Sequence, residues 1–135
     1  MPDMEKIKEK ISTDPFAGML GVRFDEMGEG YAKLSMRVRD DMLNFNGSLH
    51  GGVIYSLADI AFSAASNSHG TVAVALHADI TYLKAVPPGS TLVATGAEKN
   101  KTRRTGLYSI TIDDAEGNLI AVFEGVVYRK DQPLF

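Results

Sequence analysis

The sequence predicts an α+β protein in which one long antiparallel sheet wraps around a central buried helix. Segments on both sides of the chain's middle alternate apolar and polar residues, which is typical of strands. Between them, residues 53–66 are apolar around almost the whole circumference of a helix, and such a helix is buried. The turns after residue 89 are too short for helical crossovers, so the strands that they join are antiparallel. One sheet around one apolar helix satisfies all three observations.

Two short helices are expected at the N-terminus. Apolar residues three and four positions apart predict an amphipathic helix over residues 4–11. Asp14 is a suitable N-cap, and the proline after it suits a first helical turn. With Gly21 as the stop, the second helix runs from Pro15 to Leu20.

A hairpin follows, with strands over Val22 to Met27 and Tyr31 to Arg39 around a turn at residues 28–30. In its second strand Ala32, Leu34, Met36 and Val38 alternate with Lys33, Ser35, Arg37 and Arg39. This alternation predicts one face in the core and one face in water. The irregular stretch Asp40 to Leu49 then leads to the central helix, expected from Val53 to Ser66.

Four strands are expected after Gly70: Thr71 to Lys84, Ser90 to Lys101, Thr105 to Asp113 and Leu119 to Arg129. The turns between them contain Pro87-Pro88-Gly89, the basic run around Arg103, and residues 113–118. We find no internal repeat and no linker. A length of 135 residues suits a single domain, here 1–135.

Composition excludes several functional classes. The net charge of −3 gives no general attraction for nucleic acid, and no apolar stretch is long enough for a transmembrane helix. The absence of cysteine excludes a disulfide framework, a thiolate nucleophile and a Cys-ligated zinc site. The N-terminus lacks the apolar core of a signal peptide, so we expect a cytoplasmic protein. His50, His69 and His77 are too widely spaced to predict a metal site, and the sequence has no phosphate-binding glycine loop.

Asp59 is the unusual residue of the central helix, because Leu57, Ala58, Ile60 and Ala61 surround it. A carboxylate among apolar residues is either a hydrogen-bonded structural group or a catalytic group, and its position on the helix does not decide between them.

The start of the central helix strengthens the catalytic interpretation. Gly51 and Gly52 offer backbone N–H groups at the positive end of a helix dipole, with no side chain to block a ligand. Such donors stabilise a carbonyl oxygen that becomes an anion. Asn44 and Asn46 add polar groups to the same loop, and His50 is first interpreted as the residue that holds the loop.

The segment from Asn44 to Asp59, which contains His50-Gly51-Gly52 and Leu57-Ala58-Asp59, resembles the hotdog-fold acyl-CoA thioesterases, in particular the branch named after phenylacetic acid degradation. Residues 80–83 and 101–106 also match that family. The related naphthoyl-CoA branch usually has Glu in place of Asp59. Some relatives have Ser or Thr near Ala75 to orient water, so that assistance is missing here.

The resemblance implies that Asp59 is the catalytic carboxylate and that the Gly51 N–H polarises the thioester carbonyl. Asn44 would position water or substrate, and His50 would support the loop. Arg103, Arg104, Thr105 and Lys84 would bind the phosphates of coenzyme A, which is part of the substrate rather than a cofactor; no metal or cofactor is expected. For any one basic residue alone, a solvated loop is the better interpretation.

Hydrolysis of an aryl or medium-chain acyl-CoA to acid and free CoA is therefore the leading hypothesis. The alternatives are a hotdog dehydratase for hydroxyacyl thioesters, whose usual His-Phe-Pro context is missing, and a non-catalytic acyl-CoA-binding module. Phe62, Met42 and Leu83 are candidates for the pocket wall. Because Gly51 and Asp59 are eight positions apart, ~12 Å along a helix, one subunit cannot supply both groups to one thioester. We expect a homodimer with composite sites, assembled into a homotetramer.

Overall fold

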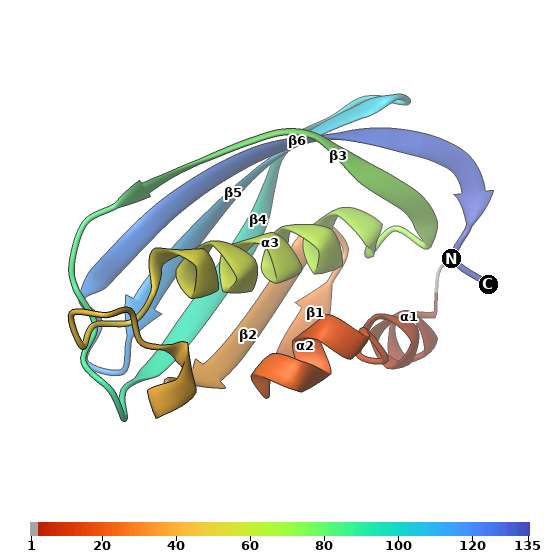
Figure 1. The fold of residues 1–135 in the computed structure, drawn as a ribbon. Coiled ribbons are helices and arrows are strands. Elements are labelled where there is room, and N and C mark those ends of the chain that lie inside the picture. The colour runs from red at the N-terminus through yellow and green to blue at the C-terminus, as the bar shows by residue number, and fades with distance from the viewer. Residues whose placement is uncertain (1–2) are drawn as a thin grey trace.

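The computed structural model describes residues 3–135, in which one six-stranded antiparallel sheet wraps around a single long helix, as predicted (Figure 1). The helices are α1 (Met4–Ile11), α2 (Pro15–Leu20) and α3 (Gly51–Asn67), with a 3-10 turn η1 at Asp40–Met42. The strands are β1 (Arg23–Gly28), β2 (Tyr31–Arg37), β3 (Thr71–Tyr82), β4 (Thr91–Lys101), β5 (Thr105–Asp114) and β6 (Leu119–Pro133). Their order across the sheet is β1-β2-β4-β5-β6-β3.

The two N-terminal helices begin and end where their capping residues predict. Asp14 accepts hydrogen bonds from the N–H groups of Phe16 (2.9 Å) and Ala17 (3.2 Å) at the start of α2. Gly21 ends that helix with a positive φ of 73°, a conformation that glycine adopts without strain.

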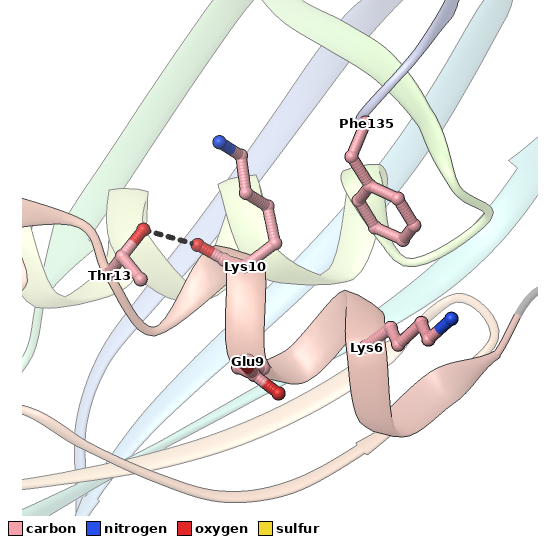
Figure 2. Close-up of a pocket in the computed structure, with 5 residues that line it drawn as sticks. All are labelled: Lys6, Glu9, Lys10, Thr13 and Phe135. Atoms are coloured by element: carbon pink, nitrogen blue, oxygen red, sulfur yellow. Dashed lines mark hydrogen bonds between the residues drawn. The ribbon is translucent and has the colours of Figure 1, made fainter.

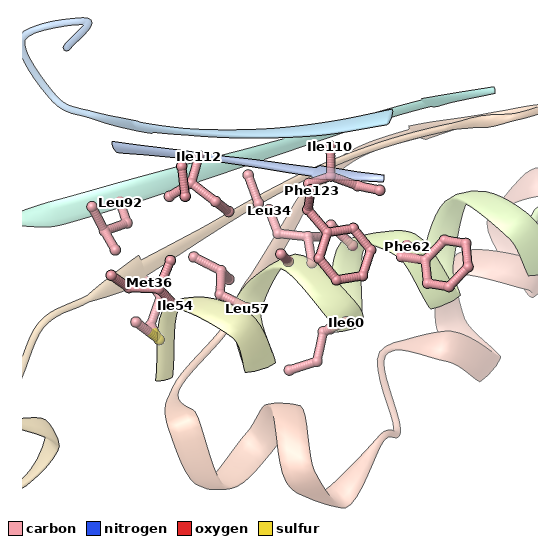
Figure 3. Close-up of a cluster of buried hydrophobic side chains, with 14 of the residues drawn as sticks. Leu34, Met36, Ile54, Leu57, Ile60, Phe62, Leu92, Ile110, Ile112 and Phe123 are labelled. Carbon is pink, nitrogen blue, oxygen red and sulfur yellow. The ribbon is translucent and has the colours of Figure 1, made fainter. Parts of the chain in front are cut away.

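The core lies between α3 and the concave face of the sheet, where Leu57 and Phe62 of the helix meet Leu34, Ile110 and Phe123 of the strands (Figure 3). Each of these side chains is fully buried, and burial of one such side chain contributes about 1.5–3 kcal/mol. Gly125 of β6 is required by this packing. A Cβ at that position would lie 2.6 Å from Cζ of Phe62.

Several details differ from the sequence predictions, and two of them are strand ends: β2 stops at Arg37 rather than Arg39, and β3 at Tyr82 rather than Lys84. α3 begins at Gly51 rather than Val53, because the side chain of His50 caps it. β6 continues from Arg129 to Pro133, because residues of this polar end still pair with the start of β3. Ser35, expected in water, is buried and accepts a hydrogen bond from Nε of Arg23 (3.3 Å).

Part of α3 and one edge of the sheet remain uncovered. The sheet covers one side of α3, whereas Gly52, Asp59 and Ser63 are exposed on the other. β3 pairs with β6 along one edge, and its other edge has no strand beside it in the described part of the chain. The prediction of a helix buried on every side is therefore wrong for a single chain.

A polar cluster joins the C-terminal end of α3 to the sheet. Ser68 accepts a hydrogen bond from the N–H of Gly30 (2.7 Å), which fixes the turn between β1 and β2. Glu98 of β4 contacts Nε2 of His69 (2.7 Å) and accepts a hydrogen bond from the hydroxyl of Tyr108 (2.6 Å). Burial favours a raised pKa for Glu98, but the hydrogen bonds from Tyr108 and His69 outweigh it and lower the pKa below its usual value of 4.5.

Candidate active site

The first turn of α3 contains a free backbone donor. Nδ1 of His50 accepts a hydrogen bond from the N–H of Gly52 (2.9 Å), and the carbonyl of His50 accepts from Val53 and Ile54. Gly51 N–H makes no hydrogen bond with any residue that the structure describes. The geometry thus separates two glycines that the sequence left equivalent: Gly52 N–H is used by the cap, and Gly51 N–H is available to a ligand.

The loop before α3 is held by Asn44. Its Oδ1 accepts hydrogen bonds from the N–H groups of Asn46 (2.9 Å) and Ser48 (3.2 Å). The backbone N–H of Asn44 also donates to the carbonyl of Ser48 (2.7 Å). Because the side-chain oxygen is occupied, what Asn44 can offer to a water or substrate is its amide N–H₂.

Asp59 lies on the uncovered face of α3, although its neighbours Ala58 and Ile60 are buried. Its carboxylate accepts no hydrogen bond from the described residues. Partial burial, reinforced by the negative charge of Asp14, raises the pKa of Asp59 above its usual value. A carboxylate with a raised pKa is a better proton acceptor once it is ionised.

A cavity of about 260 Å³ opens beside Asp59, between the second half of α3 and the start of β3. Its lining residues are Asp59, Phe62, Ser63, Ser66, Ala73, Val74, Ala75 and Val127. Of the three residues expected in the pocket wall, Phe62 lines this cavity, whereas Met42 is buried elsewhere and Leu83 is exposed. Ser63, one helical turn after Asp59, places a hydroxyl in the cavity where Ala75 has none; its i+4 spacing was the available sequence signal.

Two tyrosines near the helix start were not predicted from the sequence. The hydroxyl of Tyr82, at the end of β3, donates a hydrogen bond to the carbonyl of Gly51 (3.1 Å). Tyr55 lies one turn before Asp59, and partial burial, with the nearby Asp59 and Tyr82, raises its pKa. Only the spacing of Tyr55 from Asp59 could have been noticed in the sequence; the contact of Tyr82 depends on the packing of β3.

Arg103, Arg104 and Thr105 lie together at the turn between β4 and β5. Both guanidinium groups approach Asp131, at 3.4 and 3.2 Å, and that of Arg104 also lies 5.9 Å from the ring centre of Tyr128. Thr105 hydrogen-bonds Thr102 through its backbone N–H and its hydroxyl. Arg129, not predicted, joins this cluster by donating to the carbonyls of Thr102 and Arg103.

The structure does not bring Lys84 to this cluster. Lys84 lines a different cavity together with Asp114, the last residue of β5. Arg104 immediately precedes the first residue of that same strand. The ten residues of β5 separate the two ends by roughly 30 Å, so one chain cannot place Lys84 and Arg104 on one phosphate.

No group of three or more His, Asp or Glu side chains that could hold a metal ion occurs within residues 3–135. In the same part of the chain, the helices are too short or too polar to cross a membrane.

Comparison with known proteins identifies the family. A model of the thioesterase superfamily matches residues 46–132, which include the start of α3 and Asp59. The chain belongs to the thioesterase superfamily. An acyl-coenzyme A thioesterase of Escherichia coli, PaaI, is 40% identical over 116 residues, covering 86% of this chain and 83% of that protein. A putative esterase of Archaeoglobus fulgidus is 42% identical over 130 residues, covering 96% of this chain and 84% of that protein.

Solved thioesterase structures share the fold. That of E. coli PaaI superposes with a TM-score of 0.90 at 34% identity, covering 97% of this chain and 99% of that one. A Streptococcus mutans protein bound to acetyl CoA gives a TM-score of 0.80 at 27% identity, covering 83% of this chain and 90% of that one. These matches confirm the family resemblance seen in residues 44–59 and the predicted hotdog fold. The protein is a thioester hydrolase.

Proposed function

We propose that this protein hydrolyses acyl-CoA thioesters to the free acid and CoA, at sites that two subunits share. Asp59 of one subunit activates a water molecule, and the Gly51 N–H of the other subunit polarises the thioester carbonyl. The observation that carries the proposal is the free Gly51 N–H at the start of the helix that holds Asp59. Relatives that are named as an acyl-coenzyme A thioesterase or bound to acetyl CoA support the substrate class.

The spacing within α3 supports a composite site. Gly51 and Asp59 belong to one uninterrupted helix, ~12 Å apart along its axis. The reacting carbon must lie roughly 3 Å from the attacking oxygen while its carbonyl oxygen accepts the hydrogen bond. Two antiparallel copies of α3, related by a two-fold axis, bring each Gly51 opposite the other Asp59. The uncovered face of α3 is the face on which Asp59 lies.

The edge of β3 supports the same dimer. A twelve-residue edge strand with exposed Val74, Leu76 and Tyr82 offers unpaired backbone groups and apolar area to a second copy. Antiparallel pairing of two β3 strands would continue the sheet across the dimer and set the two α3 helices side by side. Two such dimers would form the tetramer.

The reaction begins with a water molecule between Asp59 and the thioester carbon. The carboxylate takes one proton from that water, and the remaining hydroxide attacks the carbon. Gly51 N–H, at the positive end of α3, stabilises the negative charge on the carbonyl oxygen. The carbon–sulfur bond then breaks, the leaving sulfur of CoA takes the proton from Asp59, and the acid is released with the carboxylate of Asp59 restored. The amide N–H₂ of Asn44 donates to the water or substrate, and no cofactor takes part.

Arg103 and Arg104 are proposed to bind the phosphates of CoA, together with Arg129. Their guanidinium groups are close to each other and exposed, with Asp131 as their common carboxylate. A phosphate offers stronger charge-assisted hydrogen bonds to these groups than an exposed carboxylate does. Lys84 would contribute only from another subunit.

The test measures free thiol released from a panel of aryl and aliphatic acyl-CoAs. Asp59→Asn should lower kcat by at least ~10² while acyl-CoA still binds, because the amide has the same shape but cannot accept the proton. Binding of acyl-CoA without thiol release by the unmodified protein would instead indicate a non-catalytic module.

A single turnover in ¹⁸O-water distinguishes a general-base Asp59 from a nucleophilic Asp59, because only a nucleophilic Asp59 acquires label in its side chain.

A further inference from the structure

The cavity beside Asp59 is the first part of a longer groove. A second cavity, of about 300 Å³, shares Ser63 and Ala73 with it. A third, of about 370 Å³, shares Lys10 and Thr13 with the second. We name these three adjoining cavities together the Lys10 groove. It runs from Asp59 along the second half of α3 to the C-terminal end of α1.

The lining of the Lys10 groove changes along its length. Near Asp59 its wall combines the apolar Phe62, Val74 and Val127 with Ser63 and Ser66. Further along, Asn67 forms part of the wall, but its amide is occupied by hydrogen bonds to Ser63 and Ala73. From Asp59 to Asn67 the helix rises ~12 Å, so an acyl tail directed away from Gly51 has a path of that order along α3.

The far end of the groove contains Lys6 and Lys10 together with Glu9. Lys6 and Lys10 are one turn apart on α1 and both line it, and neither forms an ion pair with a described residue. Figure 2 shows the Lys10 side chain and the Glu9 carboxylate directed to opposite sides of the helix, with the ring of Phe135 nearby. Asp14 also lines this end, but one of its oxygens accepts two N–H groups of α2.

We propose that the Lys10 groove holds the acyl group, and that this enzyme prefers acyl-CoAs whose acyl group ends in a carboxylate that pairs with Lys10. The inference rests on the proposed function, of which it specifies the substrate class. Apolar walls followed by a free ammonium group match a methylene chain or ring with an acidic end. The same end offers no such partner to a simple alkyl tail.

Tail length follows from the same geometry. The carboxylate of a short diacid would lie close to Asp59, and like charges repel most strongly at short range. The carboxylate of a longer diacid reaches further from Asp59, into the part of the groove that Lys10 lines. Each diacid is compared with the neutral acyl-CoA of the same length. The ratio of kcat/KM for suberyl-CoA to that for octanoyl-CoA should therefore exceed the ratio for succinyl-CoA to butyryl-CoA.

The experiment compares kcat/KM for suberyl-CoA and octanoyl-CoA in three proteins: the unmodified enzyme, Lys10→Met and Lys8→Met. Lys8 is the matched control, because it lies on the same helix and carries the same charge but donates to the carbonyl of Asp25, away from the groove. Lys10→Met should lower the suberyl-to-octanoyl ratio at least about tenfold, the size of one charge-assisted hydrogen bond, and Lys8→Met should leave it unchanged.

An equal ratio in Lys10→Met and the unmodified enzyme, with octanoyl-CoA still hydrolysed, would overturn the acidic tail and leave the proposed hydrolysis intact. A similar fall in Lys8→Met would also overturn it, because the effect would then come from the general charge of α1. If no acyl-CoA in the panel is hydrolysed, the proposed function and this inference fail together.

Discussion

Replacing Gly51 with proline would remove one hydrogen atom from the site and little else. Proline has no N–H, and Gly51 N–H has no partner among the described residues, so the fold loses no hydrogen bond. Position 51 is the first residue of α3, where proline is well tolerated. The preceding His50 has φ −64° and ψ 133°, within the region that a residue before proline adopts. A Cβ at position 51 would lie 3.4 Å from Cζ of Tyr82, an ordinary contact.

The expected effect is therefore on the rate and not on the fold. Loss of one donor to a developing oxyanion lowers kcat by about 10²–10³, or roughly 3–4 kcal/mol of barrier. The free energy of unfolding should stay the same or rise by ~0.4–1 kcal/mol, because proline restricts the unfolded chain. Thiol release gives kcat, and thermal unfolding gives stability. Gly51→Ala is the matched control, since it adds a Cβ and keeps the N–H.

The reasoning is refuted if Gly51→Pro is folded and its kcat equals that of Gly51→Ala.

Co-expression of the Gly51→Pro and Asp59→Asn variants tests whether two subunits share each site. Random assortment makes half of the dimers mixed, each with one intact pair of Gly51 and Asp59, so about a quarter of the activity should return. A site contained in one chain would give no recovery, because every subunit carries a defect.

Three further predictions concern charge. Asp14→Asn keeps a good N-cap for α2 and removes the negative charge that helps to raise the pKa of Asp59, so the acidic limb of the kcat/KM profile should move to lower pH; an unmoved limb would contradict this coupling. Replacing both Arg103 and Arg104 with Ala should raise KM more than it lowers kcat, and less so at high salt; an unchanged KM at low salt would make this turn merely solvated. Glu98→Gln should cost about 1–3 kcal/mol of stability at neutral pH, measured by denaturant unfolding. Because the folded-state pKa of Glu98 is lowered, that contribution is present above pH 4.5 and disappears as the pH falls through the folded-state pKa, so a difference independent of pH would contradict the charge-based role.

Most of the fold follows from local patterns in the sequence. The alternation in residues 31–38 places Leu34 and Met36 in the core, and Asp14 and Gly21 bound α2 as expected. Sequence patterns gave the wrong ends for elements whose length depends on a contact with another part of the chain. The end of β6 is polar in sequence yet pairs with β3, and Gly51 joins α3 because His50 caps it.

The candidate site divides in the same way. The sequence already pointed to the two groups of the proposed chemistry, Gly51 and Asp59, because a glycine at a helix start and an isolated carboxylate are both visible without coordinates. It could not find that Gly52 N–H is already used, nor that Tyr82 reaches the carbonyl of Gly51, because both depend on geometry. The apolar residues around α3 predicted complete burial within one chain. Composition alone does not distinguish such a helix from one whose remaining face is covered by a second chain, as in the proposed dimer.

The pairing of β3 with β6 also constrains how the chain folds during synthesis. Ala73 pairs with Arg129, and Thr71 with Pro133, so the partners of the first residues of β3 leave the ribosome more than fifty residues after them. Until then the apolar side of α3 also lacks part of its cover, including Phe123 of β6. Such non-local contacts make folding slow and leave apolar surface exposed to aggregation in the meantime. The nascent chain therefore completes this core only after β6 has been translated.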